Sequence, residues 1–166
     1  LQLVAATVVE DENLGQGSFE GRVVSWSTGQ GVAEAELTFA FGGRVTSLRA
    51  DTHGNFRFEP SEVGAHQLVT VSAVGYLPFA PQWGHSPIRF MATPGRRITG
   101  VMLTLRPAID YHGQVVDPDG NPVSNAEVTM LGADRGQTDL IPIDDHWTTD
   151  DEGTFTFNAP DNAVFV

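Results

Sequence analysis

Hydrophobic and polar residues alternate with a period of two over much of the chain. Between positions 126 and 130, Ala, Val and Met alternate with Glu and Thr, which is the pattern of a strand with one buried face. The same alternation, or a short apolar run, predicts strands at 19–24, 44–50, 67–74, 88–91 and 98–105. No window shows the 3.6-residue period of an amphipathic helix. The sequence therefore predicts an all-β protein.

Turn signals separate the predicted strands. Residues 117–122 read Asp-Pro-Asp-Gly-Asn-Pro, which places proline, aspartate and glycine where a chain reversal needs them. Residues 151–153, Asp-Glu-Gly, predict a second tight turn, after which Phe155 and Phe157 share one face. Each of these stretches predicts a strand, a turn and another strand.

Three blocks of sequence occur twice in the same order. Residues 19–24 (FEGRVV), 31–38 (GVAEAELT) and 50–58 (ADTHGNFRF) resemble 111–116 (YHGQVV), 122–129 (PVSNAEVT) and 149–157 (TDDEGTFTF). Repetition of this kind indicates that one structural module is present twice. We expect an N-terminal strand and linker at 1–16, a first β-sandwich module at 17–107 and a second module at 108–166.

The repeated blocks resemble the carboxypeptidase regulatory-like family, whose modules are transthyretin-like, prealbumin-type β-sandwiches. The residues that carry the resemblance are 113–123, 126–128 and 149–157 in the second module, and 74–76 and 98–107 in the first. The resemblance implies two tandem transthyretin-like or Ig-like β-sandwich modules. Modules that it resembles are accessory, adhesive, carbohydrate-binding or cell-surface parts of larger proteins, without catalytic residues of their own.

The second module is expected to be incomplete. It has extra residues at 133–146, between its second and third strands, and no counterpart of most of residues 66–105. A sandwich without these strands exposes an apolar groove and unpaired strand edges. Something must therefore cover them.

A further strand is predicted at Leu1–Val9. Its alternating face carries Leu1, Leu3, Ala5, Thr7 and Val9. Three interpretations remain open: the chain is part of a longer protein, this strand pairs within its own first module, or it completes the open second module of a neighbouring copy. The last would be β-strand addition, and it would build a fibre because a head-to-tail contact need not close.

Charge and composition narrow the function classes. The net charge is −12, so the chain repels phosphate backbones and is not expected to bind nucleic acid. All nine basic residues are arginine, which removes lysine-based catalysis, and there is no cysteine for disulfides or thiolate chemistry. The apolar run at Leu1–Val9 is too short to span a bilayer. The predicted location is extracellular or at the cell surface, with the periplasm as the alternative.

Acidic turns are the candidate metal sites. Asp117, Asp119 and Asn121 have the spacing that begins a calcium loop, but the twelfth position is Val128, which cannot ligate calcium. A looser site would include Asp150 and Asp151. Hairpin turns and a solvated acidic face are the preferred explanations, with calcium binding as the alternative. No other metal or cofactor is predicted.

Tryptophans are the candidate ligand contacts. Trp83, Trp26 and Trp147 could stack on sugar rings, although packing at the ends of the sandwich is the preferred explanation. No serine lies in a Gly-x-Ser-x-Gly frame, and we expect no enzyme activity. The sequence favours a structural or adhesive surface module of an exported protein, for which assembly with copies of itself by strand addition is one of the open interpretations. The alternative is an accessory, carbohydrate-binding module that binds a glycan.

Overall fold

The computed structural model describes residues 6–10, 13, 15–83, 85–133 and 140–159. The chain forms two compact units, the first made of Leu1–Pro81 with His85–Pro107 and the second of Gln82–Gly84 with Ala108–Val166. Within the described residues, the regular elements are β-strands and one short 3-10 helix, η1 (Pro81–Trp83). The all-β class that the alternating pattern predicted is confirmed.

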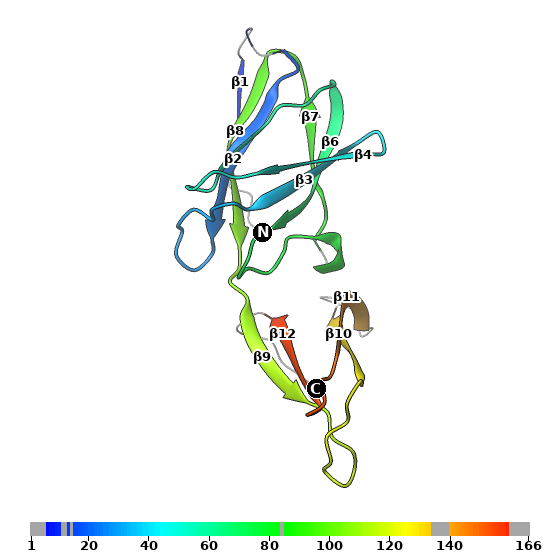
Figure 1. The fold of residues 1–166 in the computed structure, drawn as a ribbon. Helices are drawn as coiled ribbons and strands as arrows, with labels where there is room; N and C mark the ends of the chain where they lie inside the picture. The colour runs from blue at the N-terminus through cyan, green and yellow to red at the C-terminus, as the bar shows by residue number, and fades with distance from the viewer. Residues whose placement is uncertain (1–5, 11–12, 14, 84, 134–139, 160–166) are drawn as a thin grey trace. The chain divides into compact units, whose positions relative to one another are not determined.

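Two four-stranded sheets form the first unit (Figure 1). One has the order β1-β8-β2-β5 and consists of β1 (Thr7–Glu10), β8 (Arg96–Leu105), β2 (Ser18–Ser25) and β5 (Asn55–Phe58). The other has the order β4-β3-β6-β7 and consists of β4 (Arg44–Arg49), β3 (Glu36–Phe41), β6 (Gly64–Ser72) and β7 (Ile88–Ala92). Neighbouring strands are antiparallel except β2 and β8, which are parallel.

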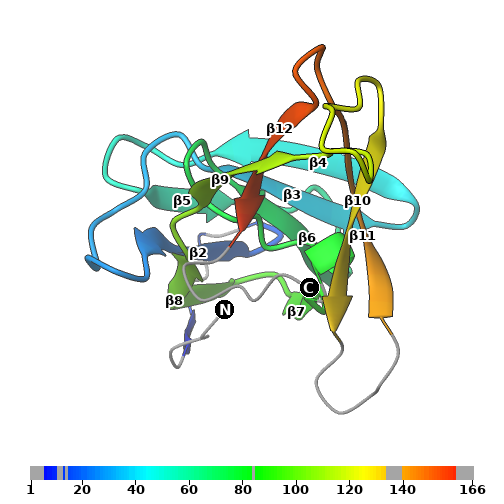
Figure 2. The ribbon, with the colours of Figure 1, turned by 90° about the horizontal axis from the view of Figure 1, so that it is seen from below.

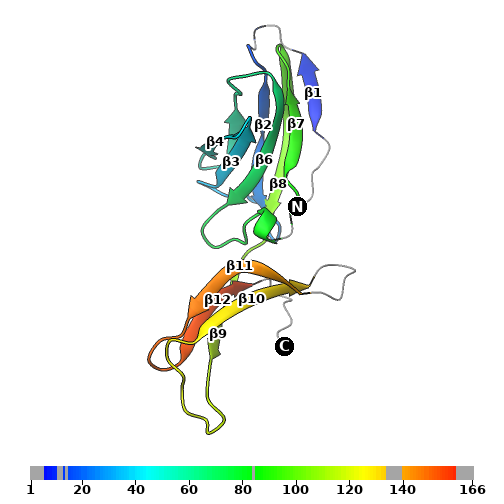
Figure 3. The ribbon, with the colours of Figure 1, turned by 90° about the vertical axis from the view of Figure 1, so that its right-hand side faces the viewer.

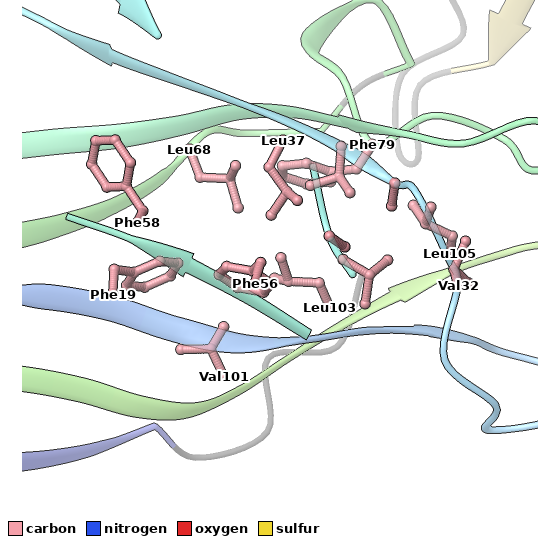
Figure 4. Packing of buried hydrophobic residues seen from close by; sticks show 14 of the residues in the cluster. Phe19, Val32, Leu37, Phe56, Phe58, Leu68, Phe79, Val101, Leu103 and Leu105 are labelled. Carbon is pink, nitrogen blue, oxygen red and sulfur yellow. The ribbon is translucent and has the colours of Figure 1, made fainter. Parts of the chain in front are cut away.

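Apolar residues at alternate positions of both sheets fill the core of the first unit (Figure 4). Leu37 and Phe39 of β3 and Leu103 and Leu105 of β8 are at most 1% exposed. The ring of Phe39 stacks on that of Phe58 with centroids 4.0 Å apart. The alternation in the sequence thus divides each strand into a core face and an outer face.

A β-bulge interrupts the pairing of β2 with β8. Phe19 lies opposite Ile98 but Gly21 lies opposite Val101, so two residues of β8 face one residue of β2 between these pairs. One of the two is Gly100, whose φ of 74° lies in the left-handed region that glycine adopts without strain. A Cβ atom at Gly21 would overlap the carbonyl oxygen of Val101, so the close approach of the two strands requires glycine there.

Two strand pairs make up the described part of the second unit, as Figures 2 and 3 show. β9 (Ile109–Gln114) pairs with β12 (Thr154–Ala159), and β10 (Glu127–Ala133) pairs with β11 (Leu140–Thr148), both antiparallel. By the repeat, β9, β10, β11 and β12 correspond in that order to β2, β3, β4 and β5 of the first unit. The extra residues at 133–146 fall partly in β10 and β11, which are longer than β3 and β4, and positions 134–139 lie outside the described residues.

The strand register repeats between the two units. Equivalent cross-strand pairs are Phe19↔Phe58 with Tyr111↔Phe157, and Gly21↔Phe56 with Gly113↔Phe155. The loops repeat as well, because Glu34 and Asn125 hold equivalent positions and both have a φ of 55°. Register and an uncommon backbone conformation thus both repeat between the two units, as expected for one module present twice, and the bounds 17–107 and 108–166 stay a prediction. The second unit is incomplete within the described residues.

Candidate functional site

The candidate site is the pair of open edges in the second unit, on β9 and β10. In the first unit, β2 has β5 and β8 as neighbours, and β3 has β4 and β6. Among the residues that the structure describes, β9 pairs only with β12 and β10 only with β11. Each therefore has one edge whose backbone donors and acceptors are available to another strand.

Side chains of the second unit are less buried than their counterparts. Val23 is 0% exposed, whereas the equivalent Val115 is half-buried. The aromatic residues show the same contrast, because Phe58 is buried and the equivalent Phe157 is only half-buried. Phe157 packs against Tyr111, with ring centroids 5.5 Å apart. The apolar face of this half-sandwich is thus partly open.

Gly113 lies where, among the described residues, β9 has no neighbour equivalent to β8. In the first unit, β8 approaches the equivalent Gly21 so closely that a Cβ atom there would overlap Val101. At Gly113 the nearest atoms around such a Cβ belong instead to the ring of Phe155. Phe155 thus lies where an added strand would approach β9, and it would have to move aside for that strand.

Part of the predicted N-terminal strand pairs within its own unit. β1 is antiparallel to β8, with Thr7 opposite Thr99 and Val9 opposite Arg97. For Thr7–Glu10 this agrees with the interpretation in which the segment pairs in its own module. Its pairing with another copy stays a prediction. The other candidates on this strand, Leu1, Leu3 and Ala5, lie outside the described residues.

The aspartates of the acidic turns are occupied by hydrogen bonds of the turns themselves. The Oδ1 atom of Asp117 accepts from the backbone N–H groups of Asp119 (2.9 Å) and Asn121 (2.8 Å). Asp150 accepts in the same way from Glu152 and Thr154. Hydrogen bonds from Asn121, above all from its side chain, lower the pKa of Asp117. Hydrogen bonds from Thr154, again above all from its side chain, lower the pKa of Asp150. These contacts account for both aspartates as Asx-turn residues.

Calcium binding at these turns stays a prediction. Asp119 and Asp151 are exposed, and the structure gives neither side chain a contact that would gather carboxylates around an ion. Within the described residues, no group of three or more His, Asp or Glu side chains is arranged to hold a metal.

Over the same residues, no helix is long and apolar enough to cross a membrane.

The three tryptophans lie on different elements. Trp26 follows β2 and is 52% exposed, and the guanidinium of Arg106 lies over its ring, 5.3 Å from the centroid. Trp147 is in β11, half-buried, with its ring 5.8 Å from that of Phe157. Trp83 belongs to η1 and is half-buried. Of the three, Trp26 is the one that offers most of its ring to solvent.

Sequence reasoning missed Gly113 and Phe155 as site residues. The repeat aligns them with Gly21 and Phe56, and this was an available signal. Its meaning depends on β8 running beside Gly21, which the sequence of β2 alone does not show.

Comparison with known proteins finds similarity in structure only. No family model and no curated protein matches the chain, so membership of the carboxypeptidase regulatory-like family stays a prediction. The chain is similar to the Bacillus anthracis TIE protein, with 16% identity and a TM-score of 0.47 over 88% of this chain and 26% of that one. It is also similar to a streptococcal ancillary pilin, with 11% identity and a TM-score of 0.46 over 90% and 51%.

A third similar structure is a DUF3823 family protein from Bacteroides uniformis. Its identity is 14% and its TM-score 0.40, over 69% of this chain and 51% of that one. The chain thus spans between a quarter and about half of the lengths of these structures. At such identities and scores the likenesses carry no information about function.

Proposed function

We propose that this chain is a non-catalytic structural or adhesive module of an exported surface protein, and that its second unit is completed by β-strand addition. One observation carries the proposal. The second unit repeats the register of the first over four strands, yet in the described residues β9 and β10 each have a neighbour on one side only. Unpaired strand edges beside a half-open apolar face are the acceptor that β-strand addition requires.

The first unit indicates what kind of strand would fit. β8 runs parallel to β2 and directs three buried apolar residues into the core, Val101, Leu103 and Leu105. By the repeat, an added strand would run parallel to β9 and place apolar residues opposite Gly113 and Val115. Once the ring of Phe155 moves aside, Gly113 would permit the same close approach as Gly21, because neither has a side chain.

The proposed donor is the segment Leu1–Val9 of a neighbouring copy. Its part Thr7–Glu10 lies at the edge of a sheet, where Val8 is 57% and Val9 41% exposed. Release from β8 therefore uncovers little buried apolar surface. Because donor and acceptor are on different units of each copy, the contact is head-to-tail and would extend into a filament.

Oligomeric state tests this proposal. Analytical ultracentrifugation and electron microscopy should show concentration-dependent assembly of the whole chain, and its loss when residues 1–10 are deleted. Gly113→Val tests the acceptor separately, because a side chain there blocks the approach to β9, and it should also abolish assembly. Val45→Asp is the matched control, since Val45 lies exposed on β4 of the first unit, and it should assemble normally.

Two outcomes would reject strand exchange between copies. One is a wild-type chain that stays monomeric at all concentrations, as expected if further residues of the same polypeptide complete the second unit. The other is an assembly whose size distribution is the same with and without residues 1–10.

Glycan binding is the second candidate function, and the exposure of Trp26 favours it. Trp26 is 52% exposed, with the guanidinium of Arg106 over its ring, and an exposed aromatic ring of this kind can stack on a sugar. Titration with neutral oligosaccharides should then change tryptophan fluorescence, and Trp26→Ala should remove the change. A response that survives in Trp26→Ala would exclude this platform.

A further inference from the structure

A groove of about 650 Å³ crosses the outer face of the first unit's β8-β2-β5 strands. Side chains that point away from the core line it, together with residues that lead into β5. The lining side chains that could bind a ligand by charge, hydrogen bonding or apolar contact are Arg22, Arg49, Asn55, Arg57, Thr99 and Met102. The volume lies within the range of small-ligand sites in proteins.

The groove is hollow because the bulge between β2 and β8 lies beneath it. Gly100 lines it and has no side chain to fill the space, and Gly21 contributes backbone only, because a Cβ there would lie against the buried Val101. The bulge places Gly100 in a left-handed conformation that few other residues adopt. Beside it, Met102 is 39% exposed on the outer face of β8. Bare backbone and a thioether therefore form an uncharged part of the lining.

Three of the chain's nine arginines line this groove, although the net charge of the protein is −12. Arg57 is neutralised by Glu59 at 2.7 Å and Glu20 at 3.5 Å. Arg49 has only loose pairs with carboxylates, each at 3.9 Å. Arg22 differs from both, as its Nε donates to the backbone carbonyl of His53 at 2.7 Å.

Arg22 has no carboxylate partner among the residues that the structure describes. The bond from Nε fixes its guanidinium, and the terminal N–H groups remain to bind a ligand oxygen. The one unshared carboxylate nearby, on Asp51, already accepts from the backbone N–H groups of His53 and Asn55. These hydrogen bonds leave Asp51 negatively charged, so the lining carries three arginines against two carboxylates, Glu20 and Asp51.

We propose that this groove binds a carboxylated oligosaccharide, such as a chain of uronic acids. Arg22 would bind a carboxylate, with Arg49 adding positive potential. The Oδ1 atom of Asn55 and the hydroxyl of Thr99 would bind sugar hydroxyl groups, while the Nδ2 atom of Asn55 donates to Asp51. Met102 and the bare backbone at Gly100 would contact a sugar ring. A peptide could add to this sheet only at β5, the edge strand of the groove, because β2 at its centre is already paired on both sides. This site is separate from the open edges of β9 and β10 and from Trp26.

Calorimetry with trigalacturonic acid, neutral galactose trimers and a glutamate trimer tests the proposal on the whole chain. The acidic sugar should bind, more weakly as salt is raised, and the other two should not. Arg22→Gln should raise the dissociation constant about tenfold or more, as expected for loss of a charge-assisted hydrogen bond. Met102→Glu should abolish binding, because it brings a negative charge into the groove at an exposed position.

Arg89→Gln is the matched control, because it makes the same charge change on an exposed arginine of β7 in the other sheet and should leave binding unchanged. Absence of binding at millimolar concentration, equal binding of the glutamate trimer or the neutral sugar, or an equal effect of Arg89→Gln would each overturn the proposal. Assembly through strand addition is measured separately and does not depend on the result.

Discussion

Val23 and Val115 form a matched pair that measures what a neighbouring strand contributes. Each backbone N–H donates to a glycine carbonyl, that of Gly54 or Gly153, at 2.8 Å. Each carbonyl accepts from an equivalent backbone N–H at 2.9 Å. Val23 is fully buried beside β8, whereas Val115, which directly follows β9, is half-buried.

Substitution by alanine should therefore have unequal effects. Val23→Ala removes two buried methyl groups, at about 0.8 kcal/mol each, and leaves a cavity, so the first unit should lose about 2–3 kcal/mol of unfolding free energy. Val115→Ala removes groups that already contact water, and the second unit should lose about 1 kcal/mol or less. The substitution and the strand register are the same in both units, so the difference between the two losses of unfolding free energy measures what the neighbouring β8 contributes at Val23.

Hydrogen exchange measured by mass spectrometry across a urea series can separate the two units. Peptides that cover β2 and β9 report each unit individually, which matters because a two-unit chain has no single unfolding free energy. Equal losses for the two variants would refute the assignment of an open edge. If strand addition occurs, the cost of Val115→Ala should rise towards that of Val23→Ala in the assembled protein.

Three further predictions concern the turns and the half-buried His85. Gly54→Ala and Gly153→Ala should each lower stability by about 2 kcal/mol or more in urea unfolding, because both glycines have positive φ and a Cβ would meet a backbone carbonyl oxygen; a loss below about 0.5 kcal/mol would contradict this. Each of three turn aspartates accepts hydrogen bonds from the residue four positions later, and these bonds lower the pKa of the aspartate below 3.8. The bond from the side chain has the largest effect and the bond from the backbone N–H the next. The aspartates are Asp51, Asp117 and Asp150. Their stabilisation is thus present above the unfolded pKa and lost as pH falls through the folded one, and carbon NMR titration should find all three depressed. Burial lowers the pKa of His85, so its contribution is complete above 6.5 and declines as pH falls below that value; a proton NMR titration midpoint above 6.5 would contradict it.

Local patterns in the sequence predicted the strands well, and long-range pairing could not be predicted. The alternation at 98–105 identified β8, which begins two residues earlier at Arg96. β6 begins at Gly64, before the predicted residue 67, because its first residues pair with β7. The parallel pairing of β8 with β2 joins residues about eighty positions apart, and no local signal specifies it.

The same limitation applies to both candidate sites. Gly113 could be recognised from the repeat as the counterpart of Gly21. The unpaired edge of β9, however, is recognised only by comparing its neighbours in the described structure with those of β2. Arg22, Arg57 and Gly100 are each unexceptional in the sequence. They meet in one groove because of the bulge and the register of three strands. Site prediction failed where a site depends on which strands are neighbours.

The position of β8 has a consequence for biosynthesis. It is the last strand of the first unit to leave the ribosome, yet it inserts between β1 and β2, which are the first. Until Leu105 has left the ribosome, the edge of β2 that pairs with β8 stays unpaired and Val23 stays exposed. The described strands of the second unit, β9 to β12, have the same pairing as the nascent first unit before β8 is added. A chaperone that binds unpaired sheet edges would therefore find a similar surface on the nascent first unit and on the second unit.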